Sequence, residues 1–236
     1  MADEFKPVPV TKAWDEAPRL RALLLDLADT GYAERFTVPG QYVKVRAPGS
    51  PKDAFMAIAS APGDRTIELL VQRSDAGGSA ADLVAAAAAG DRLEITAPAG
   101  KGFPVASERD RDVLLLAGGT GISAIRSALE HIAARRADYR RTILLFGARR
   151  ADDMAYRRLF DGWRGARVEV EPTLSRPDDP AAWTGRVGYV TAALADLALD
   201  PPLTSVFAAG GKEFLAASTE ALRSLGIPAE RIFKNF

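Results

Sequence analysis

Over residues 1–106, hydrophobic and polar positions follow the short alternating pattern of β-strands. The segments that this pattern predicts as strands are 20–27, 41–45, 54–60, 66–71 and 92–96. Turn-forming clusters such as 48–51 (PGSP) and 62–64 (PGD) separate them. One helix is predicted at 80–89, with Ser79 as its N-cap and Gly90 just beyond its end. Short strands at this spacing predict an antiparallel β-barrel or sandwich.

From residue 112 onward the pattern changes to buried strands that alternate with helices. Continuous apolar runs, typical of strands buried on both faces, occur at 113–117 and 142–147. Further strands are predicted at 167–171 and 205–209, and helices at 122–136, 152–163, 190–199 and 213–225. This alternation predicts an α/β domain with a doubly wound parallel sheet. The charged stretch 107–112 (SERDRD) is a predicted linker between a barrel domain at 1–106 and the α/β domain at 112–236.

Composition and charge exclude several classes of function. The 31 basic and 31 acidic residues cancel, so we expect no nucleic-acid partner, which would need a net positive surface. The chain has no cysteine and a single histidine, His131, which excludes disulfides, thiolate metal sites and multi-histidine metal sites. No apolar run reaches the roughly 18 residues needed for a membrane span, and the N-terminus lacks a secretory signal pattern. We therefore expect a cytoplasmic protein.

The strongest local motif is a glycine-rich turn between a predicted strand and a predicted helix, at 114–129 (LLLAGGTGISAIRSAL). Gly118, Gly119 and Gly121, with Thr120 among them, allow positive φ angles and the close approach of a phosphate. The amides at the start of the following helix favour an anion. Gly119, Gly121 and Ala124 also match the dinucleotide fingerprint G-x-G-x-x-A. Tight strand-to-helix turns use glycine without a ligand as well, so the motif has two interpretations.

Taken in order, the motifs resemble those of the ferredoxin–NADP(+) reductase superfamily, in which a flavin-binding β-barrel precedes an α/β domain that binds a nicotinamide nucleotide. The similar segments are 39–43 (PGQYV), 98–103 (PAGKGF), 118–122 (GGTGI), 147–156 (GARRADDMAY) and 206–210 (VFAAG). The segment 55–62 (FMAIASAP) and the ending 234–236 (KNF) look closest to the plant "fruit protein" group of FAD/NAD(P)-binding oxidoreductases. The resemblance covers nearly the whole chain and implies FAD and NAD(P)H as cofactors.

On the flavin side, the resemblance implies contacts from the segment 54–60. Most members of the superfamily carry R-x-Y-[ST], whereas this chain has Ala54, Met56 and Ala57 at the three functional positions. The loss of an arginine–phosphate contact weakens flavin binding. The residues that remain for the flavin, largely through backbone groups, are Phe55, Ala57, Ile58, Ala59 and Ser60. The alternative is that 55–59 is simply a buried strand of the barrel.

A second glycine turn precedes the predicted helix at 80–89. Gly77, Gly78 and Ser79 resemble the superfamily's diphosphate-binding turn, in which amides at a helix start hold the anion without a cationic side chain. Arg73, just upstream, offers a positive charge. The alternative is an ordinary capped helix.

On the nicotinamide side, Ser175 and Arg176 resemble the segment that contacts the adenosine half of NAD(P). Arg149 belongs to a G-x-R pattern after the second strand of the α/β domain, where the usual dinucleotide fold carries an acidic residue that binds the ribose. Arg176 and Arg186 form a positive pair that favours NADPH weakly over NADH, because arginine recognises phosphate well. Solvated surface arginines are the alternative.

Two further positions of the resemblance concern catalysis. Gly210 and Gly211 resemble the C-G-P turn beside the nicotinamide, and the position of its catalytic cysteine is Ala209 in this chain. The last residue, Phe236, corresponds to the terminal aromatic that lies on the flavin ring and moves aside for the nicotinamide. A hydrophobic plug that packs the chain end is the alternative for Phe236.

These observations predict a flavin-dependent oxidoreductase that passes hydride between NAD(P)H and FAD and electrons on to an acceptor. That acceptor is a separate protein, a quinone or another small molecule, because a chain without cysteine holds no cysteine-ligated iron–sulfur relay. The missing R-x-Y-[ST] side chains and Ala209 favour an alternative: a non-catalytic nucleotide-binding or electron-transfer subunit of the same fold.

Overall fold

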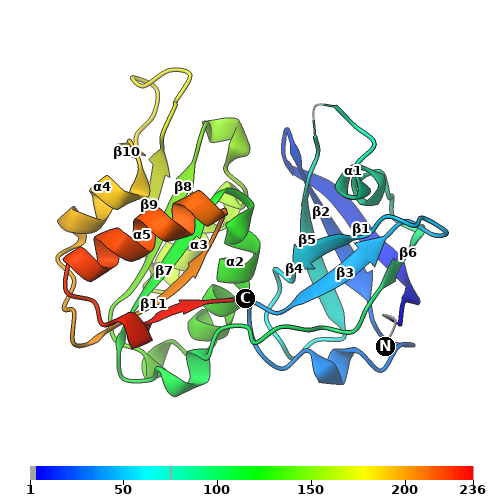
Figure 1. Ribbon diagram of the computed structural model, residues 1–236, viewed down its shortest axis with the longest axis horizontal. Helices are drawn as coiled ribbons and strands as arrows, with labels where there is room; N and C mark the ends of the chain where they lie inside the picture. The colour runs from blue at the N-terminus through cyan, green and yellow to red at the C-terminus, as the bar shows by residue number, and fades with distance from the viewer. Residues whose placement is uncertain (1–3, 75, 236) are drawn as a thin grey trace.

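The computed structural model describes residues 4–74 and 76–235, which form two lobes side by side (Figure 1). The N-terminal lobe is an antiparallel sheet in the order β4-β3-β6-β1-β2-β5. Its strands are β1 (Lys6–Ala17), β2 (Leu20–Asp26), β3 (Tyr42–Arg46), β4 (Ala54–Ala57), β5 (Thr66–Gln72) and β6 (Arg92–Ile95). The sheet is barrel-like but not closed. Its edge strands β4 and β5 form no continuous ladder with each other, and only an isolated bridge between Ile58 and Leu69 links the two edges.

The core of this lobe follows from the alternation along each strand. Val43 lies opposite Met56 in the β3–β4 ladder, and both side chains point into the apolar core. Helix α1 (Ala80–Ala85) adds Val84 to the same core. Ser79 caps α1 as predicted, in a capping box with Asp82, but the helix ends before the predicted residue 89.

The C-terminal lobe is the predicted doubly wound parallel sheet, in the order β10-β9-β8-β7-β11-β12. Its strands are β7 (Asp112–Gly118), β8 (Thr142–Ala148), β9 (Glu169–Leu174), β10 (Arg186–Val187), β11 (Thr204–Ala209) and β12 (Ile232–Lys234). Helices α2 (Ile122–Ala133) and α3 (Phe160–Gly165) cover one face, and α4 (Val190–Leu194) and α5 (Lys212–Ser224) cover the other (Figure 1). Both faces are therefore apolar, as the continuous hydrophobic runs predict.

One predicted element is wrong. The segment 152–163 is not a single helix: two short 3₁₀ turns precede α3, and Tyr156 between them has a φ of 62°. The Tyr156 side chain is fully buried, and its hydroxyl donates a 2.8 Å hydrogen bond to Glu68 Oε1 on β5. A continuous helix would carry this side chain away from that partner, so tertiary contacts override the helical pattern.

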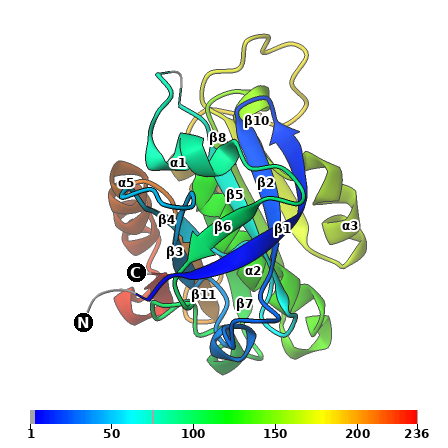
Figure 2. The ribbon, with the colours of Figure 1, turned by 90° about the vertical axis from the view of Figure 1, so that its right-hand side faces the viewer.

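The two lobes share an apolar interface. The core beneath α2 continues into the barrel-like lobe through Leu20, Leu70 and Phe103. Ser127 Oγ on α2 donates a 2.7 Å hydrogen bond to the carbonyl oxygen of Ser60. Figure 2 looks onto the barrel-like lobe with the parallel sheet behind it. Within residues 4–74 and 76–235, no helix combines the length and the apolar character that a membrane crossing requires.

Candidate functional site

A cleft of about 760 Å³ opens at the carboxyl edge of the parallel sheet. The glycine turn follows β7, which pairs with β8 on one side and with β11 on the other, so the cleft lies where the strand order reverses. Open α/β sheets bind their ligands at this switch point. The predicted site residues that line the cleft are Gly118, Gly119, Thr120, Arg149, Ser175 and Gly211.

The opposite wall of the cleft comes from the barrel-like lobe. Arg19, Leu20 and Gln72, at the ends of β2 and β5, line it. The sequence does not indicate these residues, because nothing in the local pattern of a β-hairpin shows that its end faces a second domain. Phe214 of α5 also lines the cleft without being predicted, and its position three residues after Gly211 is the sequence signal that points to it.

The glycines of the site divide into two groups. A Cβ atom on Gly121 would overlap the carbonyl group of Ala209, and one on Gly118 or Gly210 would lie 2.7 or 2.5 Å from the Phe214 ring. These three glycines therefore serve packing within the protein. Gly119, with a φ of 54°, and Gly211 have no atom of the described residues within 4 Å of a Cβ position, so they leave open space for a ligand.

Arg149 lines the cleft, Arg176 lies on the loop beside it, and both keep their charges available. The Arg176 amide donates a 2.8 Å hydrogen bond to the carbonyl oxygen of Arg149, and the neighbouring Ser175 amide donates to Ala148, so the two loops lie together. Within the described part of the chain, the side chains of Arg149 and Arg176 form no ion pair or hydrogen bond with another residue. The region between them is suited to a phosphate group.

The expected pairing of Arg176 with Arg186 is wrong. Arg186 forms ion pairs with Glu171, at 3.2 Å, and Asp196, at 2.8 Å, and these neighbours raise its pKa. Its charge is compensated inside the lobe, on the edge strand β10. Arg149, whose loop lies beside that of Arg176, is the arginine that lines the cleft.

The segment 55–60 is only partly buried. The alternative interpretation, a buried segment of the barrel, agrees with its later residues but not with Phe55. Ile58 and Ala59 are fully buried. Ser60 bonds within the protein, since its hydroxyl accepts from the Glu68 amide and its carbonyl from Ser127. Ala57 is half-buried, whereas Phe55 is 64% exposed on the outer face of β4.

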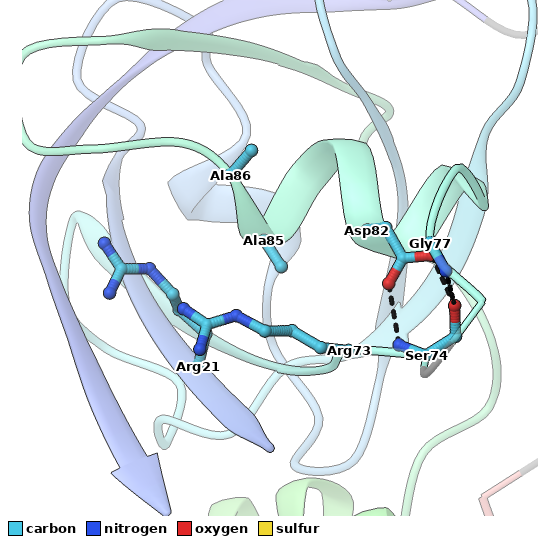
Figure 3. A pocket seen from close by; sticks show the side chains of 7 residues that line it. All are labelled: Arg21, Arg73, Ser74, Gly77, Asp82, Ala85 and Ala86. Atoms are coloured by element: carbon cyan, nitrogen blue, oxygen red, sulfur yellow. Dashed lines mark hydrogen bonds between the residues drawn. The ribbon is translucent and has the colours of Figure 1, made fainter. Parts of the chain in front are cut away.

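The second glycine turn is exposed, and oxygen atoms of the protein already accept from donors of the turn. Figure 3 shows the Gly77 amide donating to Ser74 Oγ, and Ser74 donating to Asp82. Asp82 accepts hydrogen bonds from the amides and hydroxyls of both Ser74 and Ser79, and these bonds lower its pKa far below the usual 3.8. Gly77, with Arg21 and Arg73, lines a shallow hollow of about 370 Å³. Both arginines bond Asp15, at 3.1 and 2.9 Å, so their charges are partly compensated.

The two positions singled out for catalysis have different outcomes. Ala209 is buried at the end of β11 and belongs to the core beneath α2. Phe236 lies outside the described residues. Its neighbour Asn235 donates a 3.3 Å hydrogen bond from Nδ2 to the carbonyl oxygen of Gly40, which fixes the end of the described chain against the barrel-like lobe.

Residues 115–220 match the oxidoreductase NAD-binding domain family. The chain is 33% identical over 235 residues to ferredoxin–NADP reductase B of Sorangium cellulosum. This match covers 92% of this chain and 91% of that protein. The chain is also 30% identical to the phenol hydroxylase P5 protein of Acinetobacter pittii over 160 residues. This match covers 66% of this chain but spans only 45% of the length of that protein.

Two solved structures have the same fold. A cytochrome P450 reductase of Amycolatopsis superposes with a TM-score of 0.82 at 26% identity, over 100% of this chain and 71% of that one. A ferredoxin NADP+ reductase of Neisseria gonorrhoeae with bound FAD and NADP superposes with a TM-score of 0.77 at 18% identity, over 99% and 98%. The fold, the cleft at its switch point and these likenesses agree, and the chain belongs to the ferredoxin–NADP(+) reductase superfamily of flavin- and NAD(P)-binding oxidoreductases.

Proposed function

We propose that this protein is a flavin-dependent NAD(P)H oxidoreductase. The observation that carries the proposal is the cleft itself, because one wall is the open glycine turn of the parallel sheet and the other is the barrel-like lobe. When bound, the two cofactors supply hydride transfer between nicotinamide and flavin, and the protein positions them. We propose residues 1–106 as the flavin half and 112–236 as the nicotinamide half.

The residues at the cleft fit a nicotinamide dinucleotide. Gly119 and Gly211 leave space for a backbone contact, and the 12-residue helix α2 begins directly after the glycine turn, so its positive end favours a diphosphate. Ser175 and Arg149 form the polar end of the cleft, and Arg176 follows Ser175 just beyond the lining residues. We propose that they contact the 2′-phosphate of NADPH, which gives a preference for NADPH over NADH.

The electron acceptor is a separate protein, a quinone or another small molecule. Relatives named as electron transfer components or reductase components of oxygenases support a protein acceptor. The buried Ala209 supports the second candidate, a nucleotide-binding or electron-transfer subunit that lacks its own turnover. Flavin reduction by NADPH separates the two candidates.

The test is to titrate the purified chain with FAD and then with NADPH or NADH under anaerobic conditions. Bleaching of the flavin absorbance supports the oxidoreductase, whereas NADPH binding without bleaching supports the second candidate. A chain that binds neither cofactor refutes both. Arg149→Gln and Arg176→Gln should each weaken NADPH binding about tenfold, and NADH binding little, because each removes a charge-assisted contact. Arg150→Gln is the matched control, since Arg150 already pairs with Asp178 at 3.4 Å.

A further inference from the structure

An aromatic pair lies on the outer face of the β3–β4 ladder, where Phe55 is exposed and Tyr42 is half-buried. Tyr42 lies opposite Ala57 and Lys44 lies opposite Phe55, so these four side chains share the face that points away from the core. The Tyr42 and Phe55 rings are 5.4 Å apart, tilted by 53°. Ala57 adds only a methyl group to this face and packs against the core that continues beneath α2.

The missing R-x-Y-[ST] side chains suggest that this strand offers no aromatic surface to a flavin, but its outer face does carry one. Aligned by sequence, the aromatic position is Met56, and Met56 points into the core of the lobe. The aromatic ring on the outside of the strand is Phe55, one residue earlier, and Tyr42 on the neighbouring strand widens the surface. The chain therefore keeps an aromatic surface on this strand, built from different residues.

Positive charge borders the aromatic pair. Lys44 Nζ lies 4.9 Å from the centre of the Phe55 ring. Lys52, on the loop between β3 and β4, donates a 3.3 Å hydrogen bond from Nζ to the carbonyl oxygen of Gly78. That bond brings the exposed Lys52 ammonium to the second glycine turn. A cation therefore stands two residues before Ala54, the position that lacks the arginine.

The aromatic rings and the Lys52 ammonium lie at opposite ends of this outer face, with the rings toward the chain end and the ammonium at the second glycine turn. At one end, Gly100 holds the Tyr42 ring close to the chain end, because a Cβ on Gly100 would lie 2.8 Å from Tyr42 Cε1 and 3.7 Å from the Asn235 carbonyl oxygen. That end lies where the two lobes meet. Phe55 follows, and Lys52 with Gly78 forms the other end. An elongated ligand with a planar ring at one end and a phosphate at the other fits this order.

We propose that Tyr42 and Phe55 pack against the flavin nucleotide and that Lys52 pairs with its diphosphate. This inference rests on the proposed function. Lys52 supplies the charge because Asp82 already occupies the donors of Ser74 and Ser79 at the turn and places a negative charge there. A flexible ammonium at the edge of the turn offsets that charge for an incoming phosphate.

The experiment compares the Kd of FAD with that of riboflavin, which has the ring but no phosphate, by fluorescence titration of the full chain. Lys52→Gln should weaken FAD binding about tenfold and leave riboflavin binding within about twofold, since only the charge-assisted contact is lost. Phe55→Ala should weaken both ligands about tenfold, and Phe55→Tyr should restore them, because stacking acts on the ring. Lys12→Gln, an exposed lysine on β1, is the charge-matched control.

The outcomes separate this inference from the proposed function. If the wild-type chain binds FAD and Lys52→Gln binds it equally well, or loses riboflavin to the same degree, the assignment of Lys52 is refuted while the oxidoreductase stands. Equal FAD binding by Phe55→Ala refutes the aromatic surface. If the wild-type chain binds no flavin, both proposals fail. Phe55 and Lys52 are exposed, so the variants should fold, and circular dichroism checks this.

Discussion

At the scale of single residues, the site depends on which glycines face the protein and which face the cleft. Sequence alone treats 118–121 as one phosphate-binding turn. In the structure, Gly121 packs against Ala209 and Gly118 against Phe214, while Gly119 stays open. A missing Cβ thus serves either close packing or ligand approach, and only the surrounding atoms distinguish the two.

Gly121→Ala should therefore mainly lower stability, whereas Gly119→Ala should mainly weaken NADPH binding. The first forces a methyl group into the backbone of β11, so we expect a loss of about 1–3 kcal/mol in the free energy of unfolding, the usual cost of overpacking. The second has free space, costs about 1 kcal/mol through its positive φ, and narrows the cleft, so NADPH binding should fall about tenfold. Urea unfolding and NADPH titration measure both. Equal stability losses with unchanged NADPH affinity would contradict the division.

His131 gives the molecule a pH dependence. The sequence suggests an exposed histidine on a helix, but the side chain is half-buried and its Nε2 has no partner among the described residues. Burial, and then the charges of Arg135 and Arg109, lower its pKa from the usual 6.5, against an opposing effect of Asp138. The unfolded chain therefore binds this proton more readily than the folded one.

The contribution of His131 to the free energy of unfolding should accordingly be fully present above about pH 6.5. It should decline as the pH falls below that value, because protonation of His131 favours the unfolded chain. His131→Gln should remove this part of the decline. The measurement is the urea midpoint across about pH 5 to 8, where an ordinary side chain other than histidine does not titrate. An identical slope in wild type and variant would assign the pH dependence to other groups.

At the scale of secondary-structure elements, the patterns that predict this fold well are those set by burial on both faces. The runs at β7 and β8 are continuous and apolar because helices cover both sides of the sheet, and their predicted bounds agree with the structure to within a residue. Strand β1 was not predicted. Pro7 and Pro9 interrupt its first part, which pairs only with β6, since the ladder to β2 begins at Val10. A strand tolerates proline on a side that has no hydrogen-bonded neighbour. The prolines in the sequence therefore argue against a strand that in fact forms.

The segment before α3 shows the opposite failure. Its composition suits a helix, yet Tyr156 adopts a left-handed conformation that a continuous helix forbids. The reason lies in a distant part of the sequence, because the Tyr156 amide bonds Glu16 Oε1 and its hydroxyl bonds Glu68 Oε1. No local pattern contains these two partners, and the barrel-like lobe supplies both.

Tyr156→Phe tests whether the hydroxyl holds this element in place. Removal of the buried hydrogen bond should cost about 1–3 kcal/mol, because Glu68 loses a donor in a site without water access. For a chain of this size, each kcal/mol lowers the Tm by about 2–4 °C. Tyr189→Phe, at a tyrosine that is 66% exposed, should leave the Tm nearly unchanged. Equal melting of the two variants would show that the hydroxyl does not stabilise the fold.

At the scale of the whole molecule, the site exists only when the two lobes keep their relative position. The sequence indicates the glycine turn and the serine and arginine loops because each is local, but the barrel wall of the cleft depends on how the lobes pack. Besides the apolar interface, one polar cluster spans the boundary. Arg126 Nη1 on α2 lies 2.7 Å from Glu68 Oε1 on β5, and its guanidinium lies 4.6 Å from the Tyr156 ring centre. The contact is an ion pair without hydrogen-bond alignment.

This ion pair should couple the unfolding of the two lobes. Arg126→Gln leaves Glu68 as an uncompensated, largely buried carboxylate, and such a single loss costs about 3–5 kcal/mol. Glu68→Gln should cost less, because Arg126 keeps an ion pair with Glu130, at 3.4 Å on its own helix. The double variant removes both charges and should lose less than the sum of the two single variants. Urea unfolding gives the three free energies, and calorimetry shows whether a single transition in the wild type splits into two. Additive losses with one transition in every variant would mean that this ion pair does not hold the two lobes together. A large coupling energy would mean that the walls of the cleft keep their spacing partly through an ion pair that joins the two lobes.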